Sequence, residues 1–318
     1  MNNMSRLVEI AQVDKFYSGH QALKNVSFDI PKGSIFGLLG PNGSGKTSLI
    51  RILTGITAPD NGYCTYNNVP IMPGFSRSMG YLPEERGMYK KMKVGEQLIY
   101  FARLKGLSKK DAKVKVDFWL EKLGLTDWKN KEVENLSKGM QQKIQFIAAL
   151  IHDPDFLILD EPFSGFDPIN AELIKNEILE LAKKGVTIML STHNMNSVEE
   201  LCTDMALLNK GELILYGNVK EVKRRFFSGT WRISFKGNWV NFSNALWTSA
   251  KIVEKKTEGD IHTALLELLP GNNLHTILHS LMPAVEIVAL EENIPSMHQI
   301  FVKAVGGDAT LVSNDLTE

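Results

Sequence analysis

The chain has 318 residues, of which 43% are hydrophobic and 23% are charged, a composition that suits one large or two moderate globular domains with real cores. Lys and Arg together number 36, as do Asp and Glu, so no global positive field draws the chain to nucleic acid or to an anionic membrane. The two cysteines, Cys64 and Cys202, lie far apart in the sequence and indicate a reducing cytoplasm rather than a disulfide framework.

The apolar segments are short. The N-terminal stretch MNNMSRLVEIAQVDKFY lacks the apolar core of a signal peptide. The longest apolar runs, such as FLIL and IAALI, fall far short of the ~20 residues that span a bilayer. We therefore expect the chain to meet a membrane only through a partner.

Short β-rich runs alternate with helical patterns over the first part of the chain, which is typical of a layered α/β domain. Runs at 26–30 and 34–40 indicate strands, and the continuous apolar character of 156–160 and 186–192 is typical of interior parallel strands. Lys-rich amphipathic patterns between about 87 and 135 predict a helical insertion. We expect this α/β domain to occupy residues 1–225.

A different pattern follows. Alternating apolar residues in TWRISFKG, residues 230–237, predict a half-buried strand. Further strands and amphipathic helices are expected at 251–256, 262–269, 274–281, 285–290 and 297–304. The sequence therefore predicts a small α+β domain over residues 226–306, followed by a disordered tail over 307–318.

The stretch GPNGSGKT, residues 40–47, follows a buried strand and precedes an apolar helical run, and it fits the phosphate-binding pattern G-x-x-x-x-G-K-[ST]. Its glycines let backbone N–H groups wrap phosphates at a helix N-terminus. Lys46 is expected to reach the β- and γ-phosphates and Thr47 to offer a hydroxyl to Mg²⁺.

Two carboxylates end the buried run FLILDEP. Asp160 suits Mg²⁺ as a hard oxygen ligand, directly or through water. Glu161, one residue on, is expected to point elsewhere and to act as the general base for an attacking water. Two acids at a strand end are more often a loop start or a helix cap, but the nearby phosphate loop favours the catalytic interpretation.

Five motifs in order (GPNGSGKT, LSKGM, LILDEP, SGFD and STH) make residues 5–220 resemble the ATP-binding cassette (ABC) of ABC transporters. The resemblance implies a P-loop NTPase fold with a RecA-like α/β core, an antiparallel β subdomain and a helical insertion. His193, in STH, matches the family's switch histidine at the γ-phosphate, although such a residue alone would be a cap or surface side chain. Tyr17 matches the aromatic residue that stacks on adenine; the alternative is a core aromatic.

The same resemblance implies the residues that bind ATP and Mg²⁺. In the chain that holds the phosphates, ATP would be contacted by Tyr17, Gly40, Pro41, Asn42, Gly43, Ser44, Gly45, Lys46, Thr47 and Ser48. In a second chain, the contacts would come from Ser137, Lys138, Gly139, Met140 and Asp167. Catalysis would rest on Lys46, Glu161 and His193, and Mg²⁺ on Thr47, Glu84 and Asp160.

Members of this family pack two cassettes head to tail, so that each ATP lies between one phosphate loop and the signature of the partner. This arrangement explains why one chain would carry both a phosphate loop and a second anion-binding helix start at LSKGM. We therefore expect a second ABC cassette as partner, most simply in a homodimer.

Three positions depart from the family's commonest residues. Lys138 replaces a glycine and Met140 a glutamine of the signature; Lys138 either adds charge beside the phosphate or points to solvent. Glu84 stands where most cassettes have glutamine, and it either helps to hold Mg²⁺ or faces water.

Together with LPEERGMY and the C-terminal domain, the cassette resembles ATPase subunits of ABC-2-type exporters, including the sodium-efflux type and drug or polymer exporters. This implies a cytoplasmic ATPase, peripheral at the inner face of the membrane, that drives a separate integral-membrane permease outward without nucleic acid. The alternative is a soluble mechanochemical ABC ATPase that acts on ribosomes or DNA. Met88, Tyr89 and Met92 lie where cassettes receive the permease, although core packing fits them nearly as well.

Overall fold

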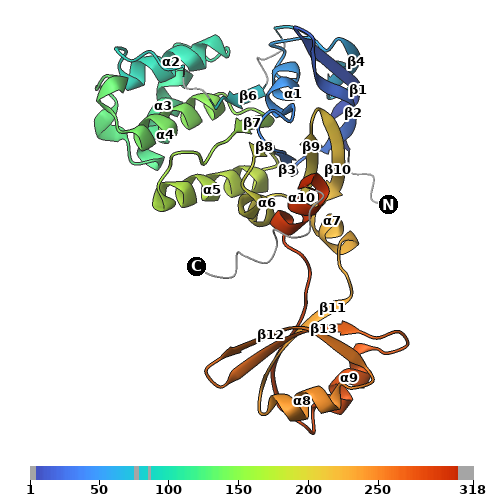
Figure 1. Ribbon diagram of the computed structural model, residues 1–318. Coiled ribbons are helices and arrows are strands. Elements are labelled where there is room, and N and C mark those ends of the chain that lie inside the picture. Colours follow the sequence, from blue (N-terminus) through green and yellow to red (C-terminus); the bar gives the residue numbers. More distant parts are fainter. Residues whose placement is uncertain (1–4, 75–78, 85–86, 307–318) are drawn as a thin grey trace. The chain divides into compact units, whose positions relative to one another are not determined.

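The computed structural model describes residues 5–74, 79–84 and 87–306, and it divides the chain into one unit up to Val219 and a second from Lys220 onward (Figure 1). We expected the boundary at 225/226. The difference corresponds to the short helix α7 (Val219–Arg225), most of which belongs to the second unit. The expected disordered tail at 307–318 lies outside the described residues, and so do residues 85 and 86 of the LPEERGMY stretch.

The first unit is built on a six-stranded sheet with the order β10-β9-β3-β8-β7-β6. All neighbouring pairs are parallel except β9 with β10. The central strands β3, β7 and β8 are buried along their whole length, as their continuous apolar sequences predicted. Their bounds are β3 (Ile35–Leu39), β6 (Met79–Leu82), β7 (Phe156–Asp160), β8 (Thr187–Thr192), β9 (Asp204–Asn209) and β10 (Glu212–Asn218).

A second, antiparallel sheet packs against the first, with helix α1 (Lys46–Leu53) contributing to the same hydrophobic core. The core joins side chains of both sheets, for example Ile10, Phe36 and Phe156. The strands of the second sheet, in the order β2-β1-β4-β5, are β1 (Arg6–Tyr17), β2 (His20–Pro31), β4 (Asn61–Tyr66) and β5 (Val69–Pro70).

Helices complete the first unit. The expected insertion lies between β6 and β7 and, in Figure 1, gathers on the side of the parallel sheet away from β1 and β2. Within the expected bounds of about 87–135 it contains α2 (Val94–Leu104), α3 (Lys109–Lys122) and two short 3₁₀ turns (Thr126–Trp128 and Val133–Asn135); α4 (Lys138–Leu150) follows beyond those bounds. Two more helices, α5 (Pro168–Lys183) and α6 (Met195–Leu201), follow β7 and β8. The expected cassette architecture is confirmed.

The start of β6 is where the insertion meets the sheet. Helix α4 packs directly on this strand because Gly80 has no side chain: a Cβ there would lie 2.3 Å from the carbonyl oxygen of Ala149. The carbonyl oxygen of Met79 accepts a hydrogen bond from Lys105 Nζ at 2.8 Å and lies 3.2 Å from His152 Nε2. Strand β6 is thus tied to α2 and α4, and it leads directly towards Glu84.

His152 makes the stability of this junction depend on pH. Burial, assisted by the nearby Lys105 ammonium, lowers the pKa of His152 to about 4. The unfolded chain would bind this proton at about pH 6.5, so protons favour unfolding and stability is lost as pH falls from about 6.5 towards 4. Between about pH 7 and 5 we expect the free energy of unfolding to fall by about 1 kcal/mol. This figure already allows for solvent screening of the half-buried ring.

Urea unfolding at both pH values would measure this loss. The His152→Gln variant should lose less stability than the wild type over the same interval, because the titrating group is gone. His20→Gln, at an exposed position, serves as the control and should behave like the wild type. Equal losses in the wild type and in His152→Gln would contradict the assignment.

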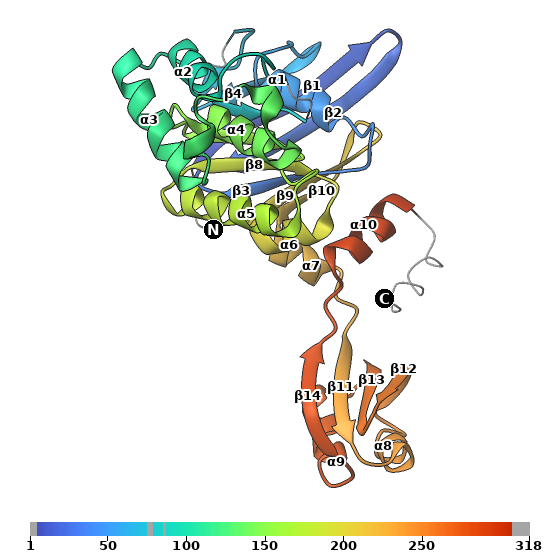
Figure 2. The same cartoon turned by 90° about the vertical axis from the view of Figure 1, so that its left-hand side faces the viewer.

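The second unit is an α+β domain with the order β12-β13-β11-β14, all antiparallel (Figures 1 and 2). The chain order is strand, helix, strand, strand, helix, strand, the arrangement called a split βαβ. Both helices cover one face and enclose a core around Ile233, Phe235 and Phe242. The bounds are β11 (Thr230–Lys236), α8 (Trp239–Ala245), β12 (Ala250–Glu258), β13 (Ile261–Leu268), α9 (Leu274–Leu281) and β14 (Glu286–Glu292), followed by α10 (Met297–Gly306).

Within the described residues, no helix combines the length and the apolar character that crossing a bilayer requires.

Candidate functional site

The loop between β3 and α1 holds the phosphate-binding motif, and its glycines are required by geometry. Gly40 has a φ of 151°, and a Cβ there would lie 2.3 Å from the carbonyl oxygen of Leu208. Gly45 has a φ of 107°, and a Cβ there would lie 2.6 Å from the carbonyl oxygen of Ala22. A loop of this kind turns successive N–H groups into a concave anion site at the helix start.

Neighbouring strands fix the loop from outside. The carbonyl oxygen of Ser44 accepts a hydrogen bond from the backbone N–H of Gly211, in the turn between β9 and β10, at 3.0 Å. The carbonyl of Gly211 in turn accepts from Lys24 N–H of β2 at 2.8 Å. The Ser44 hydroxyl is buried and has no hydrogen-bond partner among the described residues. The loop is therefore held in shape with an unsatisfied polar group inside it.

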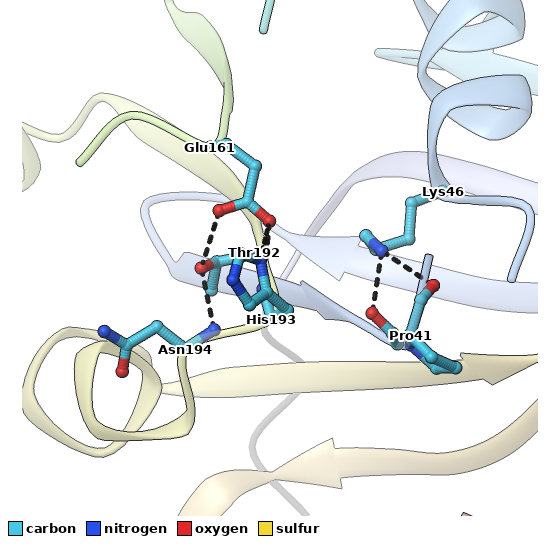
Figure 3. Close-up of polar contacts among 7 residues, drawn as sticks. Pro41, Lys46, Glu161, Thr192, His193 and Asn194 are labelled. Atoms are coloured by element: carbon cyan, nitrogen blue, oxygen red, sulfur yellow. Dashed lines mark hydrogen bonds and ion pairs between the residues drawn. The ribbon is translucent and has the colours of Figure 1, made fainter. Parts of the chain in front are cut away.

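Lys46 is buried and turns back onto its own loop. Its Nζ donates to the carbonyl oxygens of Gly40 at 2.7 Å and Pro41 at 3.1 Å (Figure 3). Burial lowers the pKa of Lys46, whereas the carboxylates of Glu161 and Asp160 oppose that shift. A buried cation that rests on two neutral carbonyls can exchange them for anionic phosphate oxygens, which are stronger partners.

Glu161 and His193 meet at the carboxyl ends of β7 and β8 (Figure 3). Glu161 Oε1 lies 2.6 Å from His193 Nδ1 and accepts from the His193 backbone N–H at 3.1 Å. Its Oε2 accepts from the Thr192 hydroxyl at 3.2 Å, and that hydroxyl accepts from the Asn194 N–H at 3.0 Å. The structure therefore fixes the direction of the Glu161 carboxylate with three separate groups.

The Glu161 backbone adopts a left-handed conformation with φ 48°. Its N–H donates to the carbonyl oxygen of Ser191 at 2.9 Å, which ties the turn after β7 to β8. This conformation, uncommon for a residue with a side chain, is typical of functional turns. The sequence did not predict it. Thr192 was also missed as a contact of Glu161, although it forms part of the STH motif.

Asp160 and Glu84 share a small cavity with Glu161, which is also lined by Gln142. Asp160 is buried, and burial raises its pKa; the carboxylates of Glu84 and Glu161 raise it further. Glu84 is exposed, as the water-facing alternative expected, and it also lines this cavity; its role toward Mg²⁺ stays a prediction.

The oxygen donors at this end of the sheet fit Mg²⁺ bound together with phosphates. Among the described residues no group of three or more His, Cys, Asp or Glu side chains is placed to hold a metal by itself. Mg²⁺ is ordinarily held by one or two carboxylates plus substrate phosphates and water, rather than by an all-protein cage. The carboxylate of Asp160 and the exposed hydroxyl-bearing Thr47 match that donor set.

The other residues expected around the phosphates lie in or next to the loop. Asn42, Gly43 and Thr47 are exposed, and Ser48 is half-buried in the first turn of α1. Tyr17 ends β1, pairs with His20 and is half-buried, with the Lys15 ammonium 5.5 Å from its ring centre. Its hydroxyl is buried without a hydrogen-bond partner among the described residues.

The LSKGM residues begin α4. Ser137 caps the helix, and its hydroxyl accepts from the Met140 N–H at 3.3 Å. Lys138 crosses the SGFD turn: a Cβ on Gly165 would lie 3.0 Å from Lys138 Cε and 3.1 Å from Nζ. Gln142 Nε2 donates to the carbonyl of Ser164. Lys138 is exposed, as the solvent-facing alternative expected, and the end of its side chain lies over this turn.

Asp167, the last residue of SGFD, caps α5. Its carboxylate accepts from the Asn170 N–H at 2.9 Å, and this hydrogen bond lowers the pKa of Asp167. No hydrogen bond or ion pair within the described part of the chain joins Asp167, Ser137 or Gly139 to the phosphate loop. The expected site residues at the starts of α4 and α5 are therefore not joined to the cluster formed by Lys46, Asp160 and Glu161.

Comparison with known proteins identifies the two units separately. The family model described as "ABC transporter" matches residues 23–164, and the model for the C-terminal domain of DrrA1-3-like ATP-binding proteins matches residues 217–305.

Individual relatives agree with these families. YhaQ of Bacillus subtilis, an uncharacterized ABC transporter ATP-binding protein, is 40% identical over 94% of this chain and 99% of its own length. The Nod factor export ATP-binding protein I of Cupriavidus metallidurans is 35% identical over 69% of this chain and 73% of its own. A solved ATP-binding subunit of an ABC transporter aligns with a TM-score of 0.65 at 28% identity, covering 69% of this chain and 93% of that one. The chain therefore belongs to the family of ABC transporter ATP-binding proteins.

Proposed function

We propose that this chain is the ATP-hydrolysing subunit of an ABC exporter, which dimerises around two Mg-ATP and drives a separate membrane permease. The observation that carries the catalytic part is the oriented Glu161 carboxylate, bound by His193 and Thr192 at the strand ends that also present Asp160. A phosphate loop alone would fit many nucleotide-binding proteins, whereas a fixed carboxylate beside it suits hydrolysis.

The phosphate loop, from Gly40 to Ser48, receives the triphosphate through its backbone N–H groups. Lys46 leaves the carbonyls of Gly40 and Pro41 and contacts the β- and γ-phosphates, where its charge is better matched. Thr47 and Asp160, with Glu84 as a further oxygen donor, would hold Mg²⁺, which would supply positive charge against the phosphate oxygens. Tyr17 stacks on the adenine.

Glu161 acts as the general base. A carboxylate oxygen takes a proton from water as the water oxygen bonds to the γ-phosphorus and the bond to the ADP oxygen breaks. His193 and Thr192 hold the carboxylate in one orientation, so little rearrangement precedes the reaction. His193 also contacts the γ-phosphate, since its largely exposed ring is free to face a ligand.

The second half of each ATP site comes from the partner chain. Ser137, Lys138, Gly139 and Met140 form the start of α4, whose N–H groups and dipole favour an anion. Asp167, the last residue of the SGFD turn over which Lys138 lies, belongs to the same half of the site. In the described part of the chain no hydrogen bond or ion pair joins Ser137, Gly139 or Asp167 to the phosphate loop, which is consistent with a role in the site of a partner chain. Hydrolysis removes the shared phosphate and so separates the two copies.

The permease binds a groove of about 220 Å³ between β6, α2 and α4, with Met88, Phe101, Leu104 and Ala149 among its lining residues. Tyr89 is exposed beside it and packs on Phe101, with ring centres 6.3 Å apart. An apolar groove with an adaptable methionine suits a short helix of a partner. Met92, the third residue expected here, is half-buried and does not line the groove.

The names of relatives support an outward direction of transport. The Cupriavidus protein is named for export, and the second unit matches a domain family defined on DrrA-type ATP-binding proteins. We therefore assign outward transport, with the chain at the inner face of the membrane through its permease.

Capture from the host's solubilised membranes with Mg-ATP tests this proposal. The wild type should retain a polytopic membrane protein at about one-to-one stoichiometry. Leu104→Glu places a charge in the groove, at a side chain that is 58% exposed, and should lower the captured permease at least about ten-fold while ATP binding is unchanged.

Val114→Glu is the matched control, because Val114 is 64% exposed on α3 and does not line the groove. It should retain the permease. Capture of ribosomal proteins in place of a membrane protein would overturn the transporter assignment and favour a soluble mechanochemical ATPase.

A further inference from the structure

The helical face of the C-terminal unit is built from two segments without acidic, lysine or arginine residues. Residues 237–250, which contain α8, and residues 268–285, which contain α9, include no Asp, Glu, Lys or Arg. This is unusual in a chain of which 23% is charged. The charges of the same unit lie instead on its strands, on the hairpin between β12 and β13, and on the helices α7 and α10, for example Lys236, Asp260 and Arg224.

The inward sides of both helices pack into the core of the domain. Phe242 and Leu246 of the α8 segment and Ile277 and Leu281 of α9 are fully buried in it. The helices lie side by side on one face of the sheet (Figures 1 and 2). Their opposite sides therefore form one outward surface.

Large apolar side chains occupy that outward surface. Trp247 is 80% exposed, Met282 is 72% exposed and Val240 is 62% exposed. Val240 and Trp247 are seven residues apart, which places them on the same side of α8 and its continuation. We define the neutral face as six exposed residues, three from α8 and its continuation and three from α9 and the residue that follows it. They are Val240, Asn244, Trp247, His275, His279 and Met282.

The absence of charge restricts what can cover the neutral face. Nucleic acid and anionic lipid both require clustered Lys or Arg, and amphipathic helices that bind membranes carry such residues on their polar side. An acidic or basic protein partner would meet no complementary charge. A second copy of the same face presents apolar groups and uncharged hydrogen-bonding groups, and no like charges meet.

We propose that the neutral face is a two-fold contact between two copies of this chain. Trp247 and Met282 supply the apolar centre, and Asn244, His275 and His279 supply polar groups around it. This contact involves no nucleotide, so it keeps two chains together after ATP has been hydrolysed and the cassettes have separated. The inference goes beyond the proposed ATP-driven dimer and does not depend on it.

Sedimentation equilibrium of the full chain tests the contact. The protein is freed of nucleotide, kept in EDTA to exclude histidine-bound metal, and measured at about pH 8, where histidine is ordinarily neutral. We expect a reversible dimer that dissociates in the micromolar range. Trp247→Glu should raise the dissociation constant at least about ten-fold, since two-fold symmetry brings two new carboxylates into one contact.

Val253→Glu is the matched control. Val253 is also exposed, at 52%, but lies on β12 outside the neutral face. It should dimerise like the wild type. Met282→Glu provides a second disrupting variant, and thermal unfolding should show all three variants folded, because the substituted side chains are exposed.

A nucleotide-free wild type that stays monomeric at tens of micromolar, or a Val253→Glu that dissociates as readily as Trp247→Glu, would overturn the proposal. So would a monomer that binds phosphatidylcholine vesicles through Trp247, because the face would then belong to a lipid surface. The Glu161→Gln, Trp247→Glu double variant separates the two proposals. It should still form the ATP-dependent dimer if the proposed function is right, whatever the neutral face does.

Discussion

Glu161→Gln is expected to lower ATP turnover about a thousand-fold while ATP binding remains intact, the loss ordinarily seen when a general base is removed. Glutamine has the shape of glutamate and can still accept the hydrogen bond from the His193 N–H, now made to Glu161 Oε1. Its NH₂ group can face Thr192, whose hydroxyl can rotate to accept. The amide, however, cannot take a proton from water.

The measurement is steady-state phosphate release, together with gel filtration in Mg-ATP, where the variant should accumulate as an ATP-bound dimer. Glu172→Gln is the control, since Glu172 is an exposed carboxylate on α5, away from the site. A Glu161→Gln protein that turns over ATP at the normal rate would remove Glu161 from its catalytic role.

Gly80→Ala is expected to destabilise the first unit by about 3 kcal/mol, at the upper end of what overpacking a core costs. The added Cβ would lie 2.3 Å from the carbonyl oxygen of Ala149 and 2.7 Å from Leu157 Cδ1. The carbonyl belongs to the backbone of α4 and cannot rotate away, so the helix must move from the strand. That movement would also disturb the path from β6 to Glu84.

Urea unfolding followed by circular dichroism measures the change. Gly87→Ala is the matched control because nothing lies within 4 Å of a Cβ at that position, and it should stay within about 0.5 kcal/mol of the wild type. Unchanged unfolding of Gly80→Ala would mean that α4 does not rest on β6 as closely as described.

Local sequence signals predicted the elements with strong periodicity or unbroken apolar character. The runs at 156–160 and 274–281 match β7 and α9 residue for residue. Helix α8 was missed because NWVNFSNA has few good helix formers and reads as a polar loop with aromatics. Its helical state comes from tertiary packing, in which Phe242 stacks on Phe235 with ring centres 3.9 Å apart.

The candidate site was predicted as a set of residues but not as a set of contacts. Motifs give the identities of Lys46, Glu161 and His193, because each chemical role demands a residue type. They do not give the return of Lys46 onto Gly40, or the packing of Lys138 over the SGFD turn. Those contacts join segments far apart or bent by left-handed residues, and no local pattern encodes them.

The order of strands in the parallel sheet has a consequence for biosynthesis. Strand β3, which leads into the phosphate loop, lies between β8 and β9, and the first of these begins only at Thr187. Roughly 150 residues must therefore be synthesised after β3 before it has a neighbour, which takes on the order of ten seconds on the ribosome. During that time a fully apolar strand stays unpaired and open to aggregation or chaperones. Although encoded near the start of the chain, the phosphate loop is thus among the last parts of its domain to reach their final form.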